Sequence, residues 1–134
     1  MNPVQEGCEA NYWLSCALID PEAMCRQVRG EKDALYVSEP GKSCPTEILE
    51  QIASINAEGR PIWKPMHMQP LYRMHPFVTA AGNGRARSNA YIESAGPKDV
   101  GMDIFERGLC LPSDNKMTME QVDVVCEVVR RCFQ

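Results

Sequence analysis

The sequence predicts an α/β protein of the α+β kind: a two-layer sandwich in which a small, mostly antiparallel sheet packs against helices. One observation behind this prediction is the order of elements, which runs strand, helix, helix, extended segment, helix, strand, helix without an internal repeat. Another is size, since 134 residues suit one domain. Hydrophobic residues also make up 44% of the chain, so a core can form without metal or disulfide staples.

The N-terminal third is predicted to hold a strand, a short helix and a brief extended segment. Residues 11–19 are a short run of aromatic and aliphatic side chains, which favours a strand covered on at least one face. The Asp-Pro pair at 20–21 supplies an N-cap and a first helical residue, so we expect a helix over 22–28. Residues 34–37 indicate a brief strand or extended connection, and residues 39–42 a turn.

A longer helix follows and is expected to run through Asn56. Ser43 or Cys44 is its expected N-cap, and Gly59 is its expected stop. Four apolar residues recur along it at helical spacing and predict a face that packs on the core: Ile48, Leu49, Ile52 and Ile55.

The middle of the chain is predicted to be mostly non-helical. Two prolines within residues 60–65 exclude a helix and restrict strand pairing to a sheet edge. Residues 66–74 are expected to hold a helical turn, and residues 80–98 a loop of a length that is usually functional or mobile. We then expect a helix over 99–107 that a glycine ends, and a strand at 109–111 that a proline ends.

The C-terminal helix has a clear start signal. Thr118 and Gln121 have the spacing of a capping box, in which each side chain satisfies the free backbone amide of the other residue. Arg130 and Arg131 complement the helix dipole at the C-terminal end. The apolar stripe of this helix is predicted to comprise Val122, Val125, Cys126, Val129 and Phe133.

Charge and cysteine usage exclude several function classes. The 14 basic and 18 acidic residues give a net charge of −4, so no nucleic-acid partner is expected. No apolar run approaches the roughly 20 residues of a membrane helix, and residues 1–6 lack a secretory signal. None of the seven cysteines has the C-x-x-C spacing. We therefore expect a cytoplasmic protein, away from membranes, with mostly buried, reduced thiols.

Residues 60–70 concentrate side chains that are able to bind a ligand. They contain two cations, an indole, a histidine, two methionines and three prolines. His67 and His75 are eight residues apart with no carboxylate or thiol at ligand spacing, so no metal site is predicted. One interpretation is a rigid, extended segment that presents donors and a flat ring to an anionic, sugar-containing ligand. The other is a proline-rich edge strand whose tryptophan and methionines fill the core.

Residues 60–70 also resemble the R-P-x-W-K-P-M-H-x-Q-P signature of the DegT/DnrJ/StrS family of nucleotide-sugar aminotransferases. Residues 105–113 and 11–14 resemble two further family segments, and the three occur in family order over about residues 11–133. The resemblance implies that residues 1–10 are a lead-in and residues 11–134 the C-terminal small domain of a fold-type-I enzyme.

The resemblance covers only that small domain. The family's large domain, which carries the Schiff-base lysine and most contacts to pyridoxal phosphate (PLP), has no counterpart in this sequence. We therefore expect no catalytic or cofactor-binding residue here, and a chain that is inactive by itself and is a piece of a longer parent or a truncated gene product. None of the five lysines in the sequence matches the Schiff-base motif; they are Lys32, Lys42, Lys64, Lys98 and Lys116.

The resemblance also implies substrate-binding residues. Arg60, Trp63, Lys64 and His67 are expected near the nucleotide-sugar, close to a homodimer interface, and His67 is expected to contact the sugar or a phosphate directly. Arg107 is expected either to bind an anionic group, such as the carboxylate of the amino donor, or to form a salt bridge within the domain.

The function implied for the parent is transfer of an amino group from a donor such as glutamate to a nucleotide-linked keto-sugar, for bacterial surface glycans. The W-K-P-M-H form resembles members that act on UDP-linked 4-keto-6-deoxy sugars. The alternatives are a non-enzymatic binding or assembly module that docks on a separate large domain, and a sugar-nucleotide sensor. The sequence departs from the family pattern at an insertion over 31–42, at Asp114, and at the long loop over 80–98.

Overall fold

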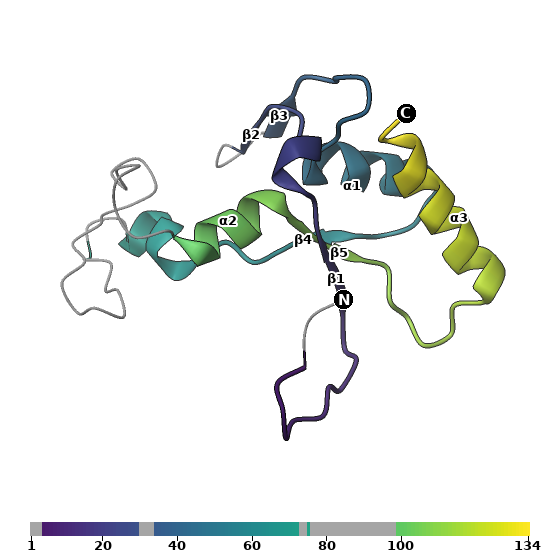
Figure 1. Ribbon diagram of the computed structural model, residues 1–134, viewed down its shortest axis with the longest axis horizontal. Coiled ribbons are helices and arrows are strands. Elements are labelled where there is room, and N and C mark those ends of the chain that lie inside the picture. The colour runs from purple at the N-terminus through teal and green to yellow at the C-terminus, as the bar shows by residue number, and fades with distance from the viewer. Residues whose placement is uncertain (1–3, 30–33, 73–74, 76–98) are drawn as a thin grey trace. The chain divides into compact units, whose positions relative to one another are not determined.

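A computed structural model describes residues 4–29, 34–72, 75 and 99–134 (Figure 1). The chain divides into two compact units, one comprising Met1–Ile62 with Glu106–Gln134 and the other Trp63–Phe105. Within the described residues the structure has three α-helices and two small antiparallel sheets, which confirms the predicted mixed fold. The loop predicted over 80–98 lies outside the described residues. In the part of the chain that the structure describes, no helix combines the length and the apolar character needed to cross a membrane.

A three-stranded antiparallel sheet forms the centre of the first unit (Figure 1). Its strands are β1 (Ser15–Leu18), β4 (Arg60–Pro61) and β5 (Gly108–Leu111), in the order β1-β5-β4. The predicted edge position of the proline-rich segment is therefore confirmed. The first strand is shorter than the predicted 11–19, because the backbone at Tyr12 has a positive φ of 51° and leaves the extended conformation there.

Helices α1 (Pro45–Ser54) and α3 (Met119–Arg131) pack against each other and against this sheet. Proline occupies the first position of α1, after Cys44 as its N-cap. The centre of the core is formed by buried side chains from both helices, from β5 and from the residue that follows β1: Ile19, Ile48, Ile52, Leu109 and Val125. The apolar spacing thus predicted the core face of α1 correctly at Ile48, Leu49 and Ile52, but it was wrong at Ile55, which follows the end of the helix and is 39% exposed.

Gly59 does not end α1, contrary to the prediction. The helix ends at Ser54, and Asn56 adopts a positive φ of 57° two residues later. A Cβ atom at Gly59 would lie 2.7 Å from Leu49 Cδ2 and 3.1 Å from the Cys110 carbonyl oxygen. Glycine is required here because the backbone passes very close to α1 and to β5.

The helix predicted over 22–28 is wrong. Asp20 does act as an N-cap, since its Oδ1 accepts a hydrogen bond from the Glu22 amide at 2.9 Å, but only one 3₁₀ turn, η1 (Pro21–Ala23), follows. The Cys25 amide then donates to the Ser43 carbonyl at 2.9 Å, which fixes the chain in an extended path. Strand β2 (Gln27–Arg29) continues and pairs antiparallel with β3 (Ala34–Tyr36).

Helix α2 (Val100–Arg107) connects the two units along the chain, and the predicted glycine ends it as the first residue of β5. In the second unit, the helical turn predicted over 66–74 is present as two 3₁₀ turns, η2 (Met66–Met68) and η3 (Pro70–Tyr72). Met68 is the buried residue of η2, with 4% of its surface exposed.

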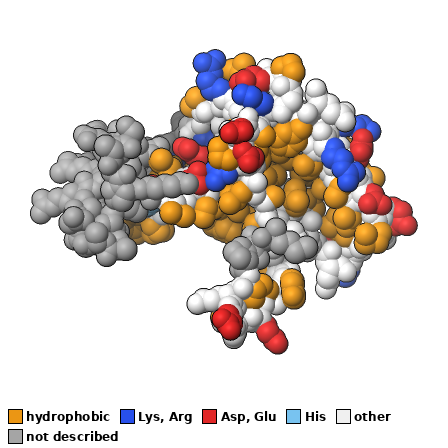
Figure 2. Space-filling view, viewed as in Figure 1, with side chains coloured by type: hydrophobic (Ala, Val, Ile, Leu, Met, Phe, Trp, Pro, Cys, Tyr) orange, Lys and Arg blue, Asp and Glu red, His pale blue; other side chains and the backbone are white. Residues whose placement is uncertain are grey.

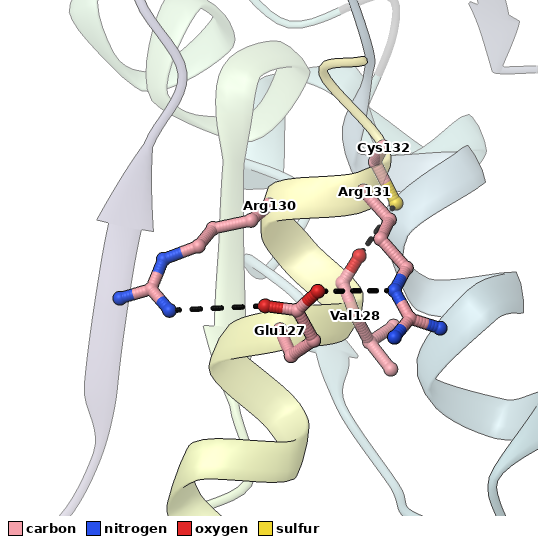
Figure 3. Close-up of polar contacts among 5 residues, drawn as sticks. All are labelled: Glu127, Val128, Arg130, Arg131 and Cys132. Atoms are coloured by element: carbon pink, nitrogen blue, oxygen red, sulfur yellow. Dashed lines mark hydrogen bonds and ion pairs between the residues drawn. The ribbon is translucent and has the colours of Figure 1, made fainter.

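The predicted capping box of α3 is confirmed. Thr118 Oγ1 accepts from the Gln121 amide at 3.3 Å, and Gln121 Oε1 accepts from the Thr118 amide at 2.9 Å. At the other end, Glu127 lies between Arg131 Nε at 3.1 Å and Arg130 Nη1 at 3.9 Å (Figure 3).

The predicted stripe of α3 is correct only in part. Val125, Val129 and Phe133 do pack on the core, but Cys126 is exposed and Val122 lies outside the core cluster. The core-facing residues also include Val128 and Cys132, and the Cys132 thiol donates to the Val128 carbonyl at 3.3 Å (Figure 3). The stripe is therefore shifted toward the C-terminal end of the helix.

All seven cysteines are free thiols, but the prediction that most are buried is wrong. Cys8 and Cys126 are exposed, because Cys8 precedes the first strand and Cys126 lies on the solvent face of α3. Two are half-buried, Cys16 and Cys132, and three are buried: Cys25, Cys44 and Cys110.

Candidate functional site

The five residues predicted to bind substrate are divided between the two units. Arg60 and Arg107 belong to the first unit, whereas Trp63, Lys64 and His67 belong to the second. The second unit therefore contains the larger part of the predicted site, in a single stretch of chain that leads into η2.

His67 is held in place by a buried carboxylate. Its Nε2 lies 2.5 Å from Asp99 Oδ2, and the two side chains are 17% and 1% exposed. The other carboxylate oxygen of Asp99 accepts from the Met102 amide at 2.9 Å, and the Asp99 carbonyl accepts from the Asp103 amide at 3.0 Å. Asp99 is thus both the N-terminal cap of α2 and the partner of the imidazole.

This contact determines how His67 can act. An ionised carboxylate only accepts hydrogen bonds, so Nε2 is the donor in the pair. The orientation of the imidazole is therefore fixed, and Nε2 is the ring nitrogen that faces Asp99. A half-buried, hydrogen-bonded histidine of this kind also has a structural role, since the pair connects η2 to the first turn of α2.

Trp63 and Lys64 are positioned by the turn that follows them. The Gln69 side chain donates from Nε2 to the Lys64 carbonyl at 3.1 Å, and its amide donates to the Met66 carbonyl at 3.0 Å. Trp63 is 63% exposed and Met66 62% exposed. The interpretation in which the tryptophan and both methionines fill the core is therefore wrong for two of the three side chains. Only Met68 is buried.

The start of α2 packs closely on the same segment. A Cβ atom at Gly101 would lie 3.3 Å from Pro65 Cγ, and so the helix approaches the proline with little space between them. Together with the His67–Asp99 contact, this packing fixes α2 against the segment that carries Trp63 and Lys64.

Arg60 lies in a different setting, at a cleft of about 680 Å³ in the first unit. The walls of the cleft come from the end of α1, from β5 and from α3, and include Leu111, Met117 and Val124. Arg60 Nη2 is 2.6 Å from Glu58 Oε1, and both side chains are more than 70% exposed. Three carboxylates also line the cleft, from Glu58, Asp114 and Glu120, so its charge opposes a diphosphate.

Arg107 has a structural partner. Its Nη1 donates to the Ile19 carbonyl, and the Ile19 amide donates to the Arg107 carbonyl at 3.0 Å. These contacts tie the end of α2 to the residue that follows β1. They favour the interpretation in which Arg107 stabilises the domain over the one in which it binds a donor carboxylate.

The described residues do not fit a PLP site. Such a site needs a lysine for the aldimine and an acidic residue for the pyridinium nitrogen. Lys42 is instead paired with Glu39 at 3.5 Å, Lys116 is exposed in the loop before α3, and Lys64 belongs to the segment already described. Within the same residues, no group of three His, Cys, Asp or Glu side chains is arranged to hold a metal ion.

The contact of Asp99 with His67 is not predicted by the sequence. Asp99 was expected only as the first residue of a helix, and it stands 32 residues from His67 along the chain. The available signal was its position immediately before a helical pattern, where aspartate is a preferred cap. A cap with one carboxylate oxygen to spare is able to bind a second donor.

One comparison with known proteins supports an aminotransferase-related region in this α+β chain. The chain is 35% identical over 89 residues to the protein named "Putative pyridoxal phosphate-dependent aminotransferase EpsN" of Bacillus subtilis (strain 168). The alignment covers 66% of this chain and 19% of that protein, so the chain corresponds to about a fifth of the length of this relative. No family model matches the chain.

Proposed function

We propose that this chain is the C-terminal small domain of a PLP-dependent aminotransferase of the DegT/DnrJ/StrS kind. The parent enzyme, a cytoplasmic homodimer, transfers an amino group from glutamate or a similar donor to a nucleotide-linked keto-sugar. PLP and its lysine belong to a separate large domain, and this chain by itself has no transaminase activity. The similarity to a named aminotransferase and the order of the three family-like segments support this proposal.

The observation that carries the proposal is the fixed imidazole of His67, which follows the exposed indole of Trp63 in the same short segment of chain. The indole of Trp63 offers a flat face for a base or a sugar ring. Asp99 restricts the rotamer of the His67 imidazole, which lowers the entropic cost of ordering this segment around a ligand. Lys64 adds a positive charge next to the indole, which suits a phosphate.

Calorimetric titration of the chain with UDP and with UDP-linked sugars tests this proposal. We expect binding that His67→Ala weakens about tenfold, the effect of one lost hydrogen bond to a charged group. His75→Ala is the matched control, since His75 is exposed and contacts only Tyr72 among the described rings, at 5.9 Å between centroids. Equal weakening by both variants, or no heat at millimolar ligand for the unaltered chain, would contradict a substrate-binding role.

A second function is favoured by a different observation. Several large apolar side chains are exposed in the first unit, including Tyr12 at 86%, Trp13 at 68% and Leu18 at 52%. Hydrophobic side chains reach the surface over much of the face drawn in Figure 2. Such a surface suits a non-enzymatic module that docks on a separate protein domain.

A further inference from the structure

Two cysteine thiols face each other across neighbouring strands of the central sheet. Cys16 in β1 and Cys110 in β5 are directly opposite each other in the antiparallel register, and the strands lie side by side (Figure 1). Their Sγ atoms are 3.6 Å apart. Directly opposite residues in antiparallel strands have Cα separations of about 4.5 or 5.5 Å, and both values fall within the range that disulfides accept.

The two thiols differ in exposure. Cys110 is in the middle strand and only 2% exposed, whereas Cys16 is half-buried. A small oxidant therefore reaches Cys16 first, and Cys110 is the nearest sulfur to whatever forms there. This arrangement of an accessible thiol beside a resolving thiol is the one found in redox-sensitive proteins.

We propose that Cys16 and Cys110 form an oxidisable dithiol, which a hydroperoxide converts into a disulfide across β1 and β5. In the first step the Cys16 sulfur attacks one oxygen of hydrogen peroxide, an S–O bond forms as the O–O bond breaks, and the departing hydroxide takes the Cys16 proton and leaves as water, so that Cys16 becomes a sulfenic acid. In the second step the Cys110 sulfur attacks the Cys16 sulfur, and the S–O bond breaks as water leaves with the Cys110 proton. In total the two thiols lose two electrons and two protons, and hydrogen peroxide is reduced to two molecules of water.

The environment of Cys110 sets the pace of the second step. Burial, and then the hydrogen bond with Cys16, raise the pKa of the Cys110 thiol to about 11. At neutral pH the thiol is protonated and resolves the sulfenic acid slowly, and its thiolate fraction grows as the pH rises toward that pKa. Below that pKa the thiolate fraction rises about tenfold per pH unit, so we expect the second step to be about a hundredfold faster at pH 9 than at pH 7.

A second thiol pair serves as an internal comparison. Cys25 and Cys44 interact with each other but are only 3% and 0% exposed. Burial raises the pKa of Cys25 to about 12. The thiols of Cys25 and Cys44 are close to each other, but neither is accessible to an oxidant as Cys16 is. We therefore expect this pair to stay reduced under the same treatment.

The experiment treats the whole chain with hydrogen peroxide, blocks the remaining thiols by alkylation under denaturing conditions, and maps the peptides by mass spectrometry. The double variant Cys8→Ser, Cys126→Ser is used alongside the unaltered chain, because exposed thiols are able to react with peroxide and to form disulfides between copies. We expect the loss of two alkylation sites per chain, a linked peptide pair containing residues 16 and 110, and full reversal by dithiothreitol.

Cys16→Ser provides the matched test, since it leaves Cys110 without its partner. Made in the Cys8→Ser, Cys126→Ser background, this variant is expected to keep all its remaining alkylation sites at the peroxide dose that closes the pair in the double variant. Circular dichroism before oxidation establishes that the variant is folded. A link between Cys25 and Cys44, or retention of both alkylation sites at residues 16 and 110 in the unaltered chain, would overturn the proposal.

Discussion

At the scale of single residues, Asp99 connects two parts of the candidate site. Its two carboxylate oxygens are used separately, one for the Met102 amide and one for His67. Asp99 is 4% exposed, so loss of either contact leaves a buried polar group without its partner. The start of α2 and the orientation of the imidazole therefore depend on one side chain.

Replacement of Asp99 separates these two roles. Asp99→Ala removes the cap and the imidazole's partner, and we expect the free energy of unfolding to fall by about 2 kcal/mol. Asp99→Asn retains a good capping side chain but loses the charge, so we expect a smaller loss of stability with weaker binding of UDP-linked sugars. Urea unfolding followed by circular dichroism and calorimetry measure the two effects. Equal stability of the two variants would show that the cap contributes nothing.

The residues of the candidate site show what a sequence can predict. The extended path, the edge position and the helical turn near His67 follow from local chemistry, because prolines restrict the backbone wherever they stand. Asp99 contacts His67 only in the folded chain. The two residues are 32 positions apart, and rules based on neighbouring residues do not predict such a contact. For the same reason the partner of Arg107, a carbonyl 88 residues away, was open to two interpretations.

At the scale of elements, α3 depends on its N-terminal signal. Thr118 and Gln121 satisfy each other's amides, and the helix that follows buries Val125 against the core. We expect Thr118→Ala to lower the free energy of unfolding by about 1 kcal/mol, whereas Thr118→Ser keeps the hydroxyl and most of the stability. Urea denaturation of the three proteins measures this difference. Identical midpoints for the alanine and serine variants would rule out a stabilising role for the box.

The elements also show where local rules fail. The segment over 22–28 has a correct helix start at Asp20, yet the chain leaves the helix after one turn. The backbone of Cys25 is bonded to Ser43, and Gln27–Arg29 finds a strand partner in Ala34–Tyr36. Pairing with residues outside the segment outweighs a weak helical preference in so short a stretch. The long periodic helices α1 and α3 were predictable because their apolar spacing repeats over several turns.

At the scale of the whole molecule, exposed apolar surface predicts self-association. We expect the sedimentation coefficient of the chain to rise with concentration, because burying side chains such as Tyr12 and Trp13 against a second copy removes apolar area from water. Trp13→Ser should reduce the rise, and Leu71→Ser, a replacement of a 77% exposed side chain in the second unit, is its matched comparison. A size that stays constant over a hundredfold range of concentration would argue against a docking module.

The central position of β5 has a consequence for the order in which the chain acquires its structure. Both neighbours of β5 precede it along the chain, and the paired residues Cys16 in β1 and Cys110 in β5 are 94 positions apart. During synthesis from the N-terminus, β1 and β4 leave the ribosome before any strand exists that pairs with them. Their edges in this sheet have no partner strand until β5 has been synthesised. A nascent chain that stops before β5 therefore lacks the central sheet, and it exposes unpaired strand edges of the kind that make incomplete chains prone to aggregate.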